Sequence, residues 1–277
     1  MESPLPLPQP QPQPQPVATH LASHLLCPCP PHSSGGGSHA EPDPRVAACF
    51  EANGLAVLVL NQPIPHSPTI FEPLWRRAQH RFCIDGGANQ LHALPDSSLL
   101  PPPTAIIGDL DSIIPSVQSH YEQMGTLIQH YSDQDTTDLM KALYYLDTVT
   151  GTRKSTVVVF GGLSGRLDHV LSTLKVLFRE KDRDMIVVSE ESLAICLPEG
   201  KHRVLVSGMD GPACGLLPLE AEAVLTTRGL KWDLQEQPSS FAGLLSTSNV
   251  ITAKDEIYVE TTQPVVWTCQ LTSSGKQ

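Results

Sequence analysis

The chain has 277 residues, 40% of them hydrophobic, which is enough for one large or two medium domains with a core in each. It carries 29 acidic and 18 basic side chains, a formal net charge of −11. Such a surface repels nucleic acid and anionic membranes, and no apolar run reaches the roughly 18 residues that a membrane span needs. A polyanionic ligand would need a cation as mediator, which favours a metal held by carboxylates.

The seven cysteines are odd in number and scattered, and none form a C-x-x-C pair. This pattern argues against a zinc site, although Cys27 and Cys29 leave a single C-x-C. Reduced thiols in a cytosolic protein are the expected state, so we predict a cytoplasmic location.

Residues 1–44 differ from the rest of the chain. They contain a proline–glutamine repeat, a run of three glycines and no Lys or Arg. Such tracts cannot form a core and favour extended, solvated conformations, so we expect a disordered tail. Without positive charge it fits neither a transit peptide nor a secretory signal, and a role as an SH3-type ligand is the alternative.

From residue 45 to 190, short apolar runs alternate with helical patterns. Strands are predicted at Leu55–Leu60, Arg81–Asp85, Thr104–Gly108, Thr156–Phe160 and Met185–Val188. Helices are predicted at Thr69–His80, Pro115–Met124 and Thr136–Leu146, with another ending near Arg179. This alternation predicts an α/β domain around a mostly parallel sheet.

After residue 190 the helical patterns stop. Strands are predicted at Leu193–Leu197, Arg203–Val206, Ala223–Thr227, Leu244–Ser246, Ile257–Thr261 and Val265–Leu271. Turns rich in Gly, Pro and Asp separate them, which predicts a smaller all-β sandwich domain over residues 191–277.

Two polar clusters directly follow predicted strands, where ligands bind in open α/β sheets. Asp85-Gly-Gly-Ala-Asn89 suits a close backbone approach to a ligand, or only a turn and helix cap. In Gly108-Asp-Leu-Asp-Ser112, an extended chain would point Asp109 and Asp111 the same way, roughly 6–7 Å apart. Two such carboxylates suit Mg²⁺, and a polar turn that caps the next helix is the alternative.

The third cluster, Asp133-Gln-Asp-Thr-Thr-Asp138, precedes a predicted helix. Asp135 or Thr136 can be its N-cap, but capping does not explain three aspartates in six positions. Asp138 can complete a metal set with Asp109 and Asp111.

The fourth cluster, Gly161-Gly-Leu-Ser-Gly-Arg-Leu-Asp168, joins a strand to a helix. Its backbone amides and the Arg166 guanidinium suit phosphate oxygens. The spacing matches neither the P-loop nor the dinucleotide fingerprint, which argues against both classes.

In order and spacing, these four clusters resemble the thiamine pyrophosphokinase family. The resemblance extends to Asn61-Gln-Pro63, Thr227-Arg-Gly-Leu-Lys-Trp232 and Leu245-Ser-Thr-Ser-Asn249, and it runs from about residue 55 to the C-terminus. It implies an α/β catalytic domain, a β-sandwich that binds thiamine, and a homodimer with active sites between subunits.

The resemblance also implies roles for single residues. Catalysis would fall to Asp109, Asp111, Asp138 and Arg166, and Mg²⁺ would be held by the three aspartates. Substrate binding would involve Asp85, Gln134, Asp135, Thr137, Asp168, Trp232, Ser246, Ser248 and Asn249.

The implied reaction moves a pyrophosphoryl group from ATP to the hydroxyl of thiamine and releases AMP. Two alternatives stay open on the sequence: another Mg²⁺-dependent phosphotransferase or phosphohydrolase on this scaffold, and a non-catalytic binder of thiamine or nucleotide.

Overall fold

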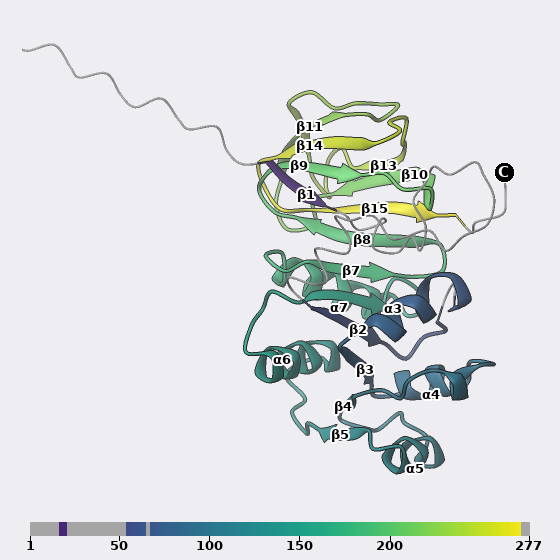
Figure 1. Cartoon of the computed structure of the whole chain (residues 1–277). Helices are drawn as coiled ribbons and strands as arrows, with labels where there is room; N and C mark the ends of the chain where they lie inside the picture. Colours follow the sequence, from purple (N-terminus) through teal and green to yellow (C-terminus); the bar gives the residue numbers. More distant parts are fainter. Residues whose placement is uncertain (1–16, 21–53, 65–66, 273–277) are drawn as a thin grey trace, which may run out of the picture.

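The computed structural model describes residues 17–20, 54–64 and 67–272 (Figure 1). Its strands are β1 Val17–His20, β2 Leu55–Val59, β3 His80–Ile84, β4 Ala105–Gly108, β5 Leu127–His130, β6 Thr156–Phe160, β7 Met185–Val188, β8 Ser192–Leu197, β9 Gly200–Leu205, β10 Asp210–Leu217, β11 Ala223–Arg228, β12 Gln237–Ser239, β13 Ser246–Val250, β14 Glu256–Thr261 and β15 Val265–Leu271. Its α-helices are α3 Glu72–Arg77, α4 Gly87–His92, α5 Pro115–Gln123, α6 Asp138–Thr150 and α7 Leu167–Arg179, with short turns η1 Ser67–Phe71 and η2 Ser97–Leu99.

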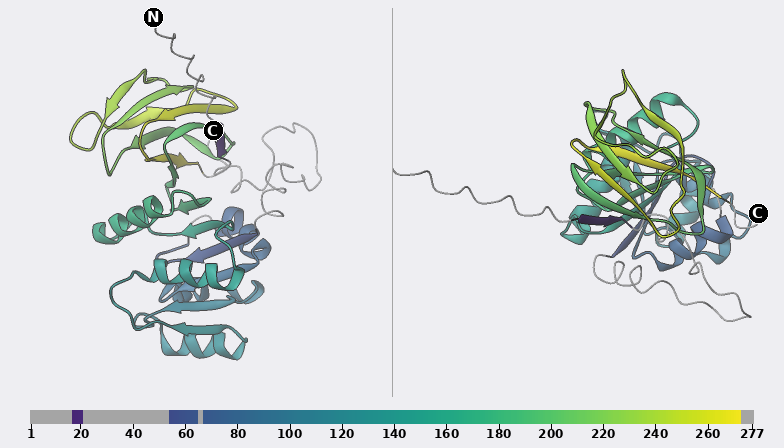
Figure 2. Two further views of the ribbon diagram at one scale, coloured as in Figure 1. Left: turned by 90° about the vertical axis from the view of Figure 1, so that its left-hand side faces the viewer. Right: turned by 90° about the horizontal axis from the view of Figure 1, so that it is seen from above.

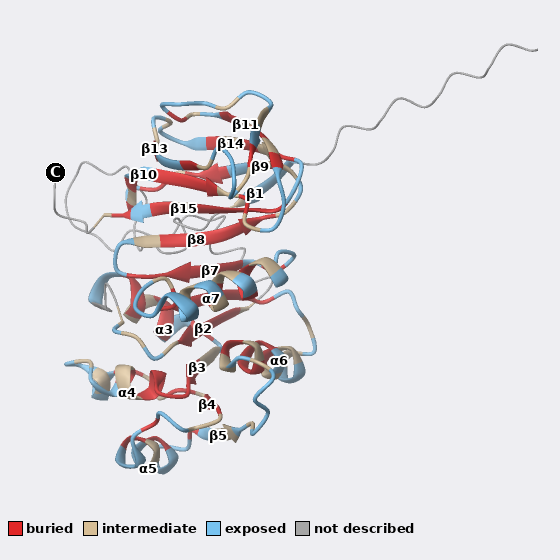
Figure 3. Cartoon of the chain, turned by 180° about the vertical axis from the view of Figure 1, so that it is seen from behind, coloured by how far each residue is buried: buried red, intermediate tan, exposed pale blue. Residues whose placement is uncertain are grey.

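The first part of the chain forms a parallel α/β layer. Its strands pair in parallel in the order β7-β6-β2-β3-β4-β5. Ala56 and Leu58 share a core with residues of α6 and α7, whereas Val57 and Val59 share the other core with residues of α3, α4 and α5. Because both faces are covered, β2 is buried along its length (Figure 3), and its residues form a continuous apolar run rather than an alternating one.

The second part continues the same sheet. β8 pairs antiparallel with β7, and the ten-stranded sheet runs β13-β10-β15-β8-β7-β6-β2-β3-β4-β5. A second sheet, β1-β9-β14-β11-β12, shares a core with β8, β10 and β15 and completes the sandwich at one end of the molecule (Figure 2). The predicted fold class is confirmed, but backbone hydrogen bonds cross the boundary expected near residue 190.

Several elements differ from the predicted ones. α4 and β5 were not predicted, because two glycines open the helix and β5 has only four residues, none of them buried. β10 was also missed, since its glycines and proline read as turns. The helix expected from residue 69 is a π-helical turn followed by α3, and α6 begins at Asp138 rather than Thr136. None of the described helices is both long and apolar enough to cross a membrane.

A short strand lies within the segment that we expected to be disordered. β1 pairs in parallel with β9 and forms the edge of the second sheet, and the ring nitrogens His20 Nε2 and His202 Nδ1 lie 2.9 Å apart. His202 is buried and its Nε2 also lies 2.8 Å from the carbonyl oxygen of Pro198. The remainder of residues 1–44 lies outside the described residues.

Deleting residues 1–44 is expected to leave turnover unchanged and to lower the melting temperature by a few degrees. Burial, with a smaller effect of His202, lowers the pKa of His20 from 6.5 to about 4. The undocked strand therefore binds a proton more readily, so docking weakens as pH falls from about 6.5 towards 4.

The melting temperatures of the full chain and the deletion variant, compared at pH 7.5 and pH 5, check this. The difference between the two proteins should shrink at pH 5. A melting-temperature difference that is equal at both pH values would contradict the lowered pKa of His20 in the docked strand.

Candidate active site

A cleft of about 560 Å³ opens beyond the carboxyl ends of β2, β3, β4 and β6. Its lining is Leu60, Asn61, Gln62, Ile84, Asp85, Asp109, Asp111, Ser112, Gln134, Asp135, Thr136, Thr137, Asp138, Leu139, Lys141, Gly162, Arg166, His169, Ser172, Thr173 and Val176. All four clusters predicted from the sequence contribute to it, because parallel strands end at one rim of the sheet.

Three carboxylates converge in this cleft. Asp85, Asp109 and Asp111 each offer an oxygen, and these oxygens lie within 4.8 Å of one another. The backbone N–H of Ser112 donates to Asp85 Oδ1 at 3.2 Å, and its hydroxyl donates to Asp111 Oδ1 at 2.7 Å. Oxygen ligands at this spacing suit a hard divalent cation.

Unusual backbone conformations produce this convergence. Asp85 has φ 46° and Leu110 has φ 63°. Both values lie in the left-handed region of backbone conformation, which residues other than glycine adopt uncommonly. The segment from Asp109 to Asp111 is therefore a tight turn and not the extended chain we predicted, although both carboxylates still face one volume. Strain of this kind, held by its surroundings, is typical of functional sites.

Two glycines permit the close approaches. A Cβ on Gly87 would lie 2.1 Å from the carbonyl oxygen of Val59, so only glycine lets α4 start against β2. Gly108 has φ +155°, and a Cβ there would meet Asp85 Cβ at 3.0 Å and Asp138 Cγ at 3.3 Å. Asp85 and Asp138 thus both approach the side of the Gly108 backbone where a Cβ would stand.

Asp85 is the buried member of the cluster, with 7% of its surface exposed. Burial raises the pKa of its carboxyl and the charge of Asp111 adds to this effect, while hydrogen bonds from Ser112 and the Gly86 backbone oppose it. A nearby cation would offset this cost by favouring the ionised form.

Asp138 stands beside the cluster but is not one of its three members. Its Oδ1 accepts from Lys141 Nζ at 2.9 Å, within the first turn of α6. The N-cap of α6 is Thr137, whose hydroxyl accepts from the N–H of Met140 at 3.4 Å. The sequence had suggested Asp135 or Thr136 as the N-cap, and neither residue caps the helix.

The loop before α6 places Gln134 and Asp135 in the cleft lining. Gln134 Nε2 lies 3.4 Å from Asp109 Oδ2. Asp133 faces its own loop, where it accepts from the Thr136 hydroxyl and from the Asp135 N–H, and these bonds lower its pKa. One of the three aspartates therefore organises the loop, and Asp135 and Asp138 line the cleft.

The glycine loop between β6 and α7 forms the opposite wall. Gln62 holds it, accepting from the Gly162 N–H at 2.9 Å and donating to the Ser164 carbonyl at 2.6 Å. Arg166 donates to both oxygens of Asp168, at 3.1 and 2.6 Å, and both side chains are exposed. Arg166 lines the cleft, and Asp168 orients it from outside the lining.

The residues expected to bind thiamine lie elsewhere. Trp232 is 55% exposed, and the Asn249 amide holds its backbone, accepting from Trp232 N at 3.2 Å and donating to Trp232 O at 2.8 Å. Lys231 Nζ lies 4.6 Å from the Trp232 ring centroid. Ser246, Ser248 and Asn249 belong to β13, where Ser248 has φ 56°.

Within one chain this second group cannot reach the carboxylates. β13 and β4 are eight strand spacings apart in the ten-stranded sheet. At about 4.8 Å per spacing, this is about 38 Å along the sheet. The structure therefore brings residues of the four sequence clusters together in the cleft. It leaves Trp232 and the residues of β13 apart from them.

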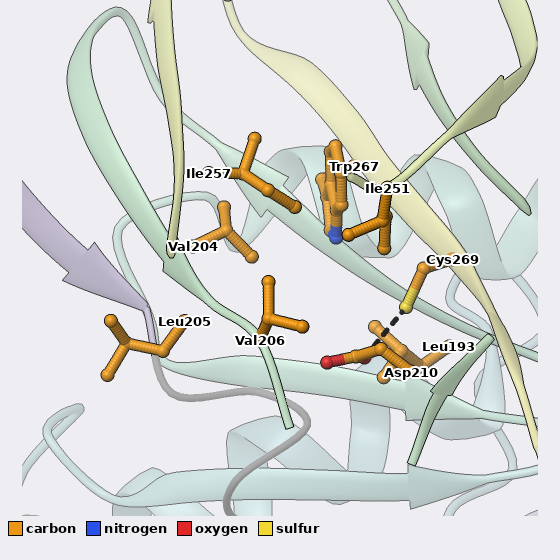
Figure 4. Close-up of a pocket in the computed structure, with 9 residues that line it drawn as sticks. All are labelled: Leu193, Val204, Leu205, Val206, Asp210, Ile251, Ile257, Trp267 and Cys269. Carbon is orange, nitrogen blue, oxygen red and sulfur yellow. Dashed lines mark hydrogen bonds between the residues drawn. The ribbon is translucent and has the colours of Figure 1, made fainter. Parts of the chain in front are cut away.

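A small cavity inside the sandwich does not supply a thiamine site (Figure 4). It measures about 10 Å³ and is lined by Leu193, Val204, Leu205, Val206, Asp210, Ile251, Ile257, Trp267 and Cys269. Asp210 is tied to this wall by the Cys269 thiol at 3.2 Å and the Ser207 N–H at 2.6 Å. This volume holds at most one water molecule.

Gln62 and Lys141 are two polar residues of the cleft that were not among the predicted site residues. Gln62 lay in a segment quoted only for the resemblance, and its distance of 102 positions from Ser164 hid the contact. Lys141 read as an ordinary helix residue, although its position three residues after Asp138 was a detectable signal for an ion pair.

Comparison with known proteins agrees with this geometry. Residues 71–189 match the family model "Thiamin pyrophosphokinase, catalytic domain", and residues 201–266 match "Thiamin pyrophosphokinase, vitamin B1 binding domain". "Thiamine pyrophosphokinase 2" of Arabidopsis thaliana is 38% identical over 248 residues, covering 82% of this chain and 91% of that relative. "Thiamine pyrophosphokinase 3" of Oryza sativa subsp. japonica is 37% identical over 237 residues, covering 78% and 86%.

Solved structures show the same fold. The crystal structure of yeast thiamin pyrophosphokinase superposes with a TM-score of 0.76 at 19% identity, covering 98% of this chain and 96% of that one. The thiamin pyrophosphokinase from Candida albicans superposes with a TM-score of 0.72 at 23% identity, covering 80% and 90%. With both family models matched in order and the converging carboxylates of the cleft inside the first, the chain belongs to the thiamin pyrophosphokinase family of enzymes.

Proposed function

We propose that the carboxylate cleft carries out the family reaction, the transfer of a pyrophosphoryl group from ATP to the hydroxyl of thiamine. The observation that carries the proposal is the convergence of Asp85, Asp109 and Asp111 opposite a glycine loop with a cleft-lining Arg166. The family assignment makes the chain an enzyme of ATP-dependent thiamine diphosphate synthesis, and it does not favour the alternative phosphotransferase or the non-catalytic binder.

The donor set fits Mg²⁺. Asp109 and Asp111, with Asp85 as the third oxygen donor, would hold the ion, and Asp138 lies beside Asp85 next to Gly108. The sequence assigned the third position to Asp138, and the oxygen spacing favours Asp85. When bound, the ion would supply positive charge that offsets the negative charge developing on the phosphates during transfer.

The protein positions the two reactants. In-line attack by the thiamine hydroxyl on the β-phosphorus releases AMP, and such transfers depend on alignment and charge neutralisation. Arg166, oriented by Asp168, can grip phosphate oxygens with two N–H groups. Gln134 and Asp135, together with the N-cap Thr137, form the wall against which the polyphosphate would lie.

Thiamine binding is proposed at the sandwich, with Trp232 as the stacking surface beside Ser246, Ser248 and Asn249. About 38 Å of sheet separates this surface from the carboxylates of the same chain. A two-fold homodimer solves the problem if one subunit presents its sandwich to the cleft of its partner. The division at residue 190 then separates phosphate chemistry from thiamine recognition.

We also propose a cytoplasmic location. The four cysteines that the structure describes, Cys83, Cys196, Cys214 and Cys269, are free and buried. Cys214 and Cys269 are directly paired on adjacent strands without a disulfide, which fits a reducing compartment.

Product analysis tests the reaction. Purified protein with thiamine, ATP and Mg²⁺ is expected to form thiamine diphosphate and AMP in equal amounts, measured by chromatography or phosphorus NMR. ADP as the nucleotide product would refute pyrophosphoryl transfer. Folded protein that does not turn over thiamine would instead support the alternative of a non-catalytic binder.

A further inference from the structure

Lys141 is a buried cation on the floor of the cleft. Only 5% of its side chain is exposed, and the residue is part of the cleft lining. A lysine is seldom buried to this extent unless its charge is compensated. Its compensation here is Asp138 Oδ1, at 2.9 Å.

The cleft is strongly acidic around this lysine. Its acidic lining residues are Asp85, Asp109, Asp111, Asp135 and Asp138. Of the described residues that line it, two carry permanent positive charge, Lys141 and Arg166. A polyphosphate that enters such a site meets repulsion except where these two cations and a bound metal ion lie.

The two cations differ in position. Arg166 has 71% of its side chain exposed, so its charge is screened by solvent at the rim. Lys141 lies in the desolvated floor, where an ionic hydrogen bond is stronger. Its ammonium has three N–H donors and makes its one hydrogen bond among the described residues to Asp138, so donors remain for a ligand.

We propose that Lys141 binds a phosphate oxygen of the nucleotide while it keeps its ion pair with Asp138. The proposal rests on the proposed function, since it assumes that the polyphosphate lies in this cleft. Lys141 is then the deep phosphate contact and Arg166 the outer one, and together they hold the polyphosphate from both sides of the carboxylate cluster.

Direct binding tests the contact. Lys141→Met removes the charge and keeps the length of the side chain. Calorimetry with α,β-methylene-ATP and Mg²⁺, an analogue whose scissile bond cannot break, should show a dissociation constant raised about 10- to 100-fold. Binding of thiamine alone should stay unchanged, and Lys141→Arg should restore part of the affinity.

The matched control is Lys175→Met, which removes an exposed charge from α7 outside the cleft lining. It should bind the analogue as the wild type does. If Lys141→Met leaves Asp138 unpaired and does not fold, the double variant Asp138→Asn/Lys141→Met removes both charges of the ion pair. Compared with Asp138→Asn alone, the double variant should still bind the analogue at least tenfold more weakly.

The outcomes separate the two proposals. Wild-type protein that binds the analogue and releases AMP, together with equal affinity in folded Lys141→Met, would overturn the phosphate contact and leave the function intact. A loss of turnover with unchanged analogue affinity would make Lys141 only a partner of Asp138, which also overturns it. Wild-type protein that does not bind the analogue would refute the proposed function itself.

Discussion

Asp111→Asn is expected to lower turnover by about 100-fold or more while the protein stays folded. The side chain is exposed at the rim of the cluster, and asparagine has the same shape and still accepts a hydrogen bond from the Ser112 hydroxyl. The variant therefore removes charge without removing packing. Since the charge counts most where phosphate charge develops, the loss should fall on turnover more than on stability.

Two further variants separate metal binding from folding. Asp138→Asn should also remove most of the rate, but it strands the buried Lys141 ammonium, so its melting temperature should fall as well. Asp96→Asn, an exposed carboxylate that makes no capping bond, is the control and should behave as the wild type.

Manganese binding followed by electron paramagnetic resonance gives a readout independent of turnover. Asp111→Asn should bind Mn²⁺ more weakly than the wild type and Asp96→Asn equally well. Wild-type turnover of Asp111→Asn at saturating Mg²⁺ would show that this residue serves only the turn.

The second large effect is rescue between subunits. A chain inactivated by Asp111→Asn and a chain inactivated on the sandwich side by Trp232→Ala with Asn249→Ala should recover activity when they are mixed and allowed to exchange. If each site combines two chains, one of the two sites in every heterodimer is intact. Random exchange makes half of the dimers mixed, so recovery should approach about a quarter of the wild-type rate.

The reason lies in the layout of the sheet. Trp232 stands on a loop fixed by Asn249, with Lys231 over one face of the indole, so a thiazolium has the other face available. Trp232→Ala alone should raise the KM for thiamine about tenfold, near 1.4 kcal/mol, and leave the KM for ATP unchanged.

Mixed dimers must be verified by differential tagging before the assay. Verified heterodimers without activity would mean that each site is built within one chain. An unchanged KM for thiamine in Trp232→Ala would make the indole a packing residue.

The fold could be predicted where a local pattern decides the structure. The apolar runs of β2 and β6 mark strands buried on both faces, and Pro115 marks the start of α5. β5 could not be found this way, because it is an exposed edge strand whose order comes from pairing with β4. The crossing from β7 to β8 likewise depends on hydrogen bonds that no local pattern encodes.

The candidate site likewise divides into residues that a local pattern predicts and residues that only the tertiary structure brings in. Asp109 and Asp111 were predictable from their position after a strand, and Arg166 from the glycine loop before a helix. That Asp85 is nearer the pair than Asp138 depends on the adjacency of β3 and β4 and on left-handed backbone at Asp85 and Leu110. Lys141 required knowledge of which face of α6 turns towards the cleft.

The shared sheet also determines how the molecule comes apart. β8 is hydrogen-bonded to β7 on one side and to β15 on the other, so cutting the chain near residue 190 would expose two apolar strand edges at once. Such edges invite aggregation, and each half expressed alone is expected to be insoluble. In the intact chain, amide protons of β7, β8 and β15 should exchange with solvent together, in one cooperative opening that spans the α/β layer and the β-sandwich.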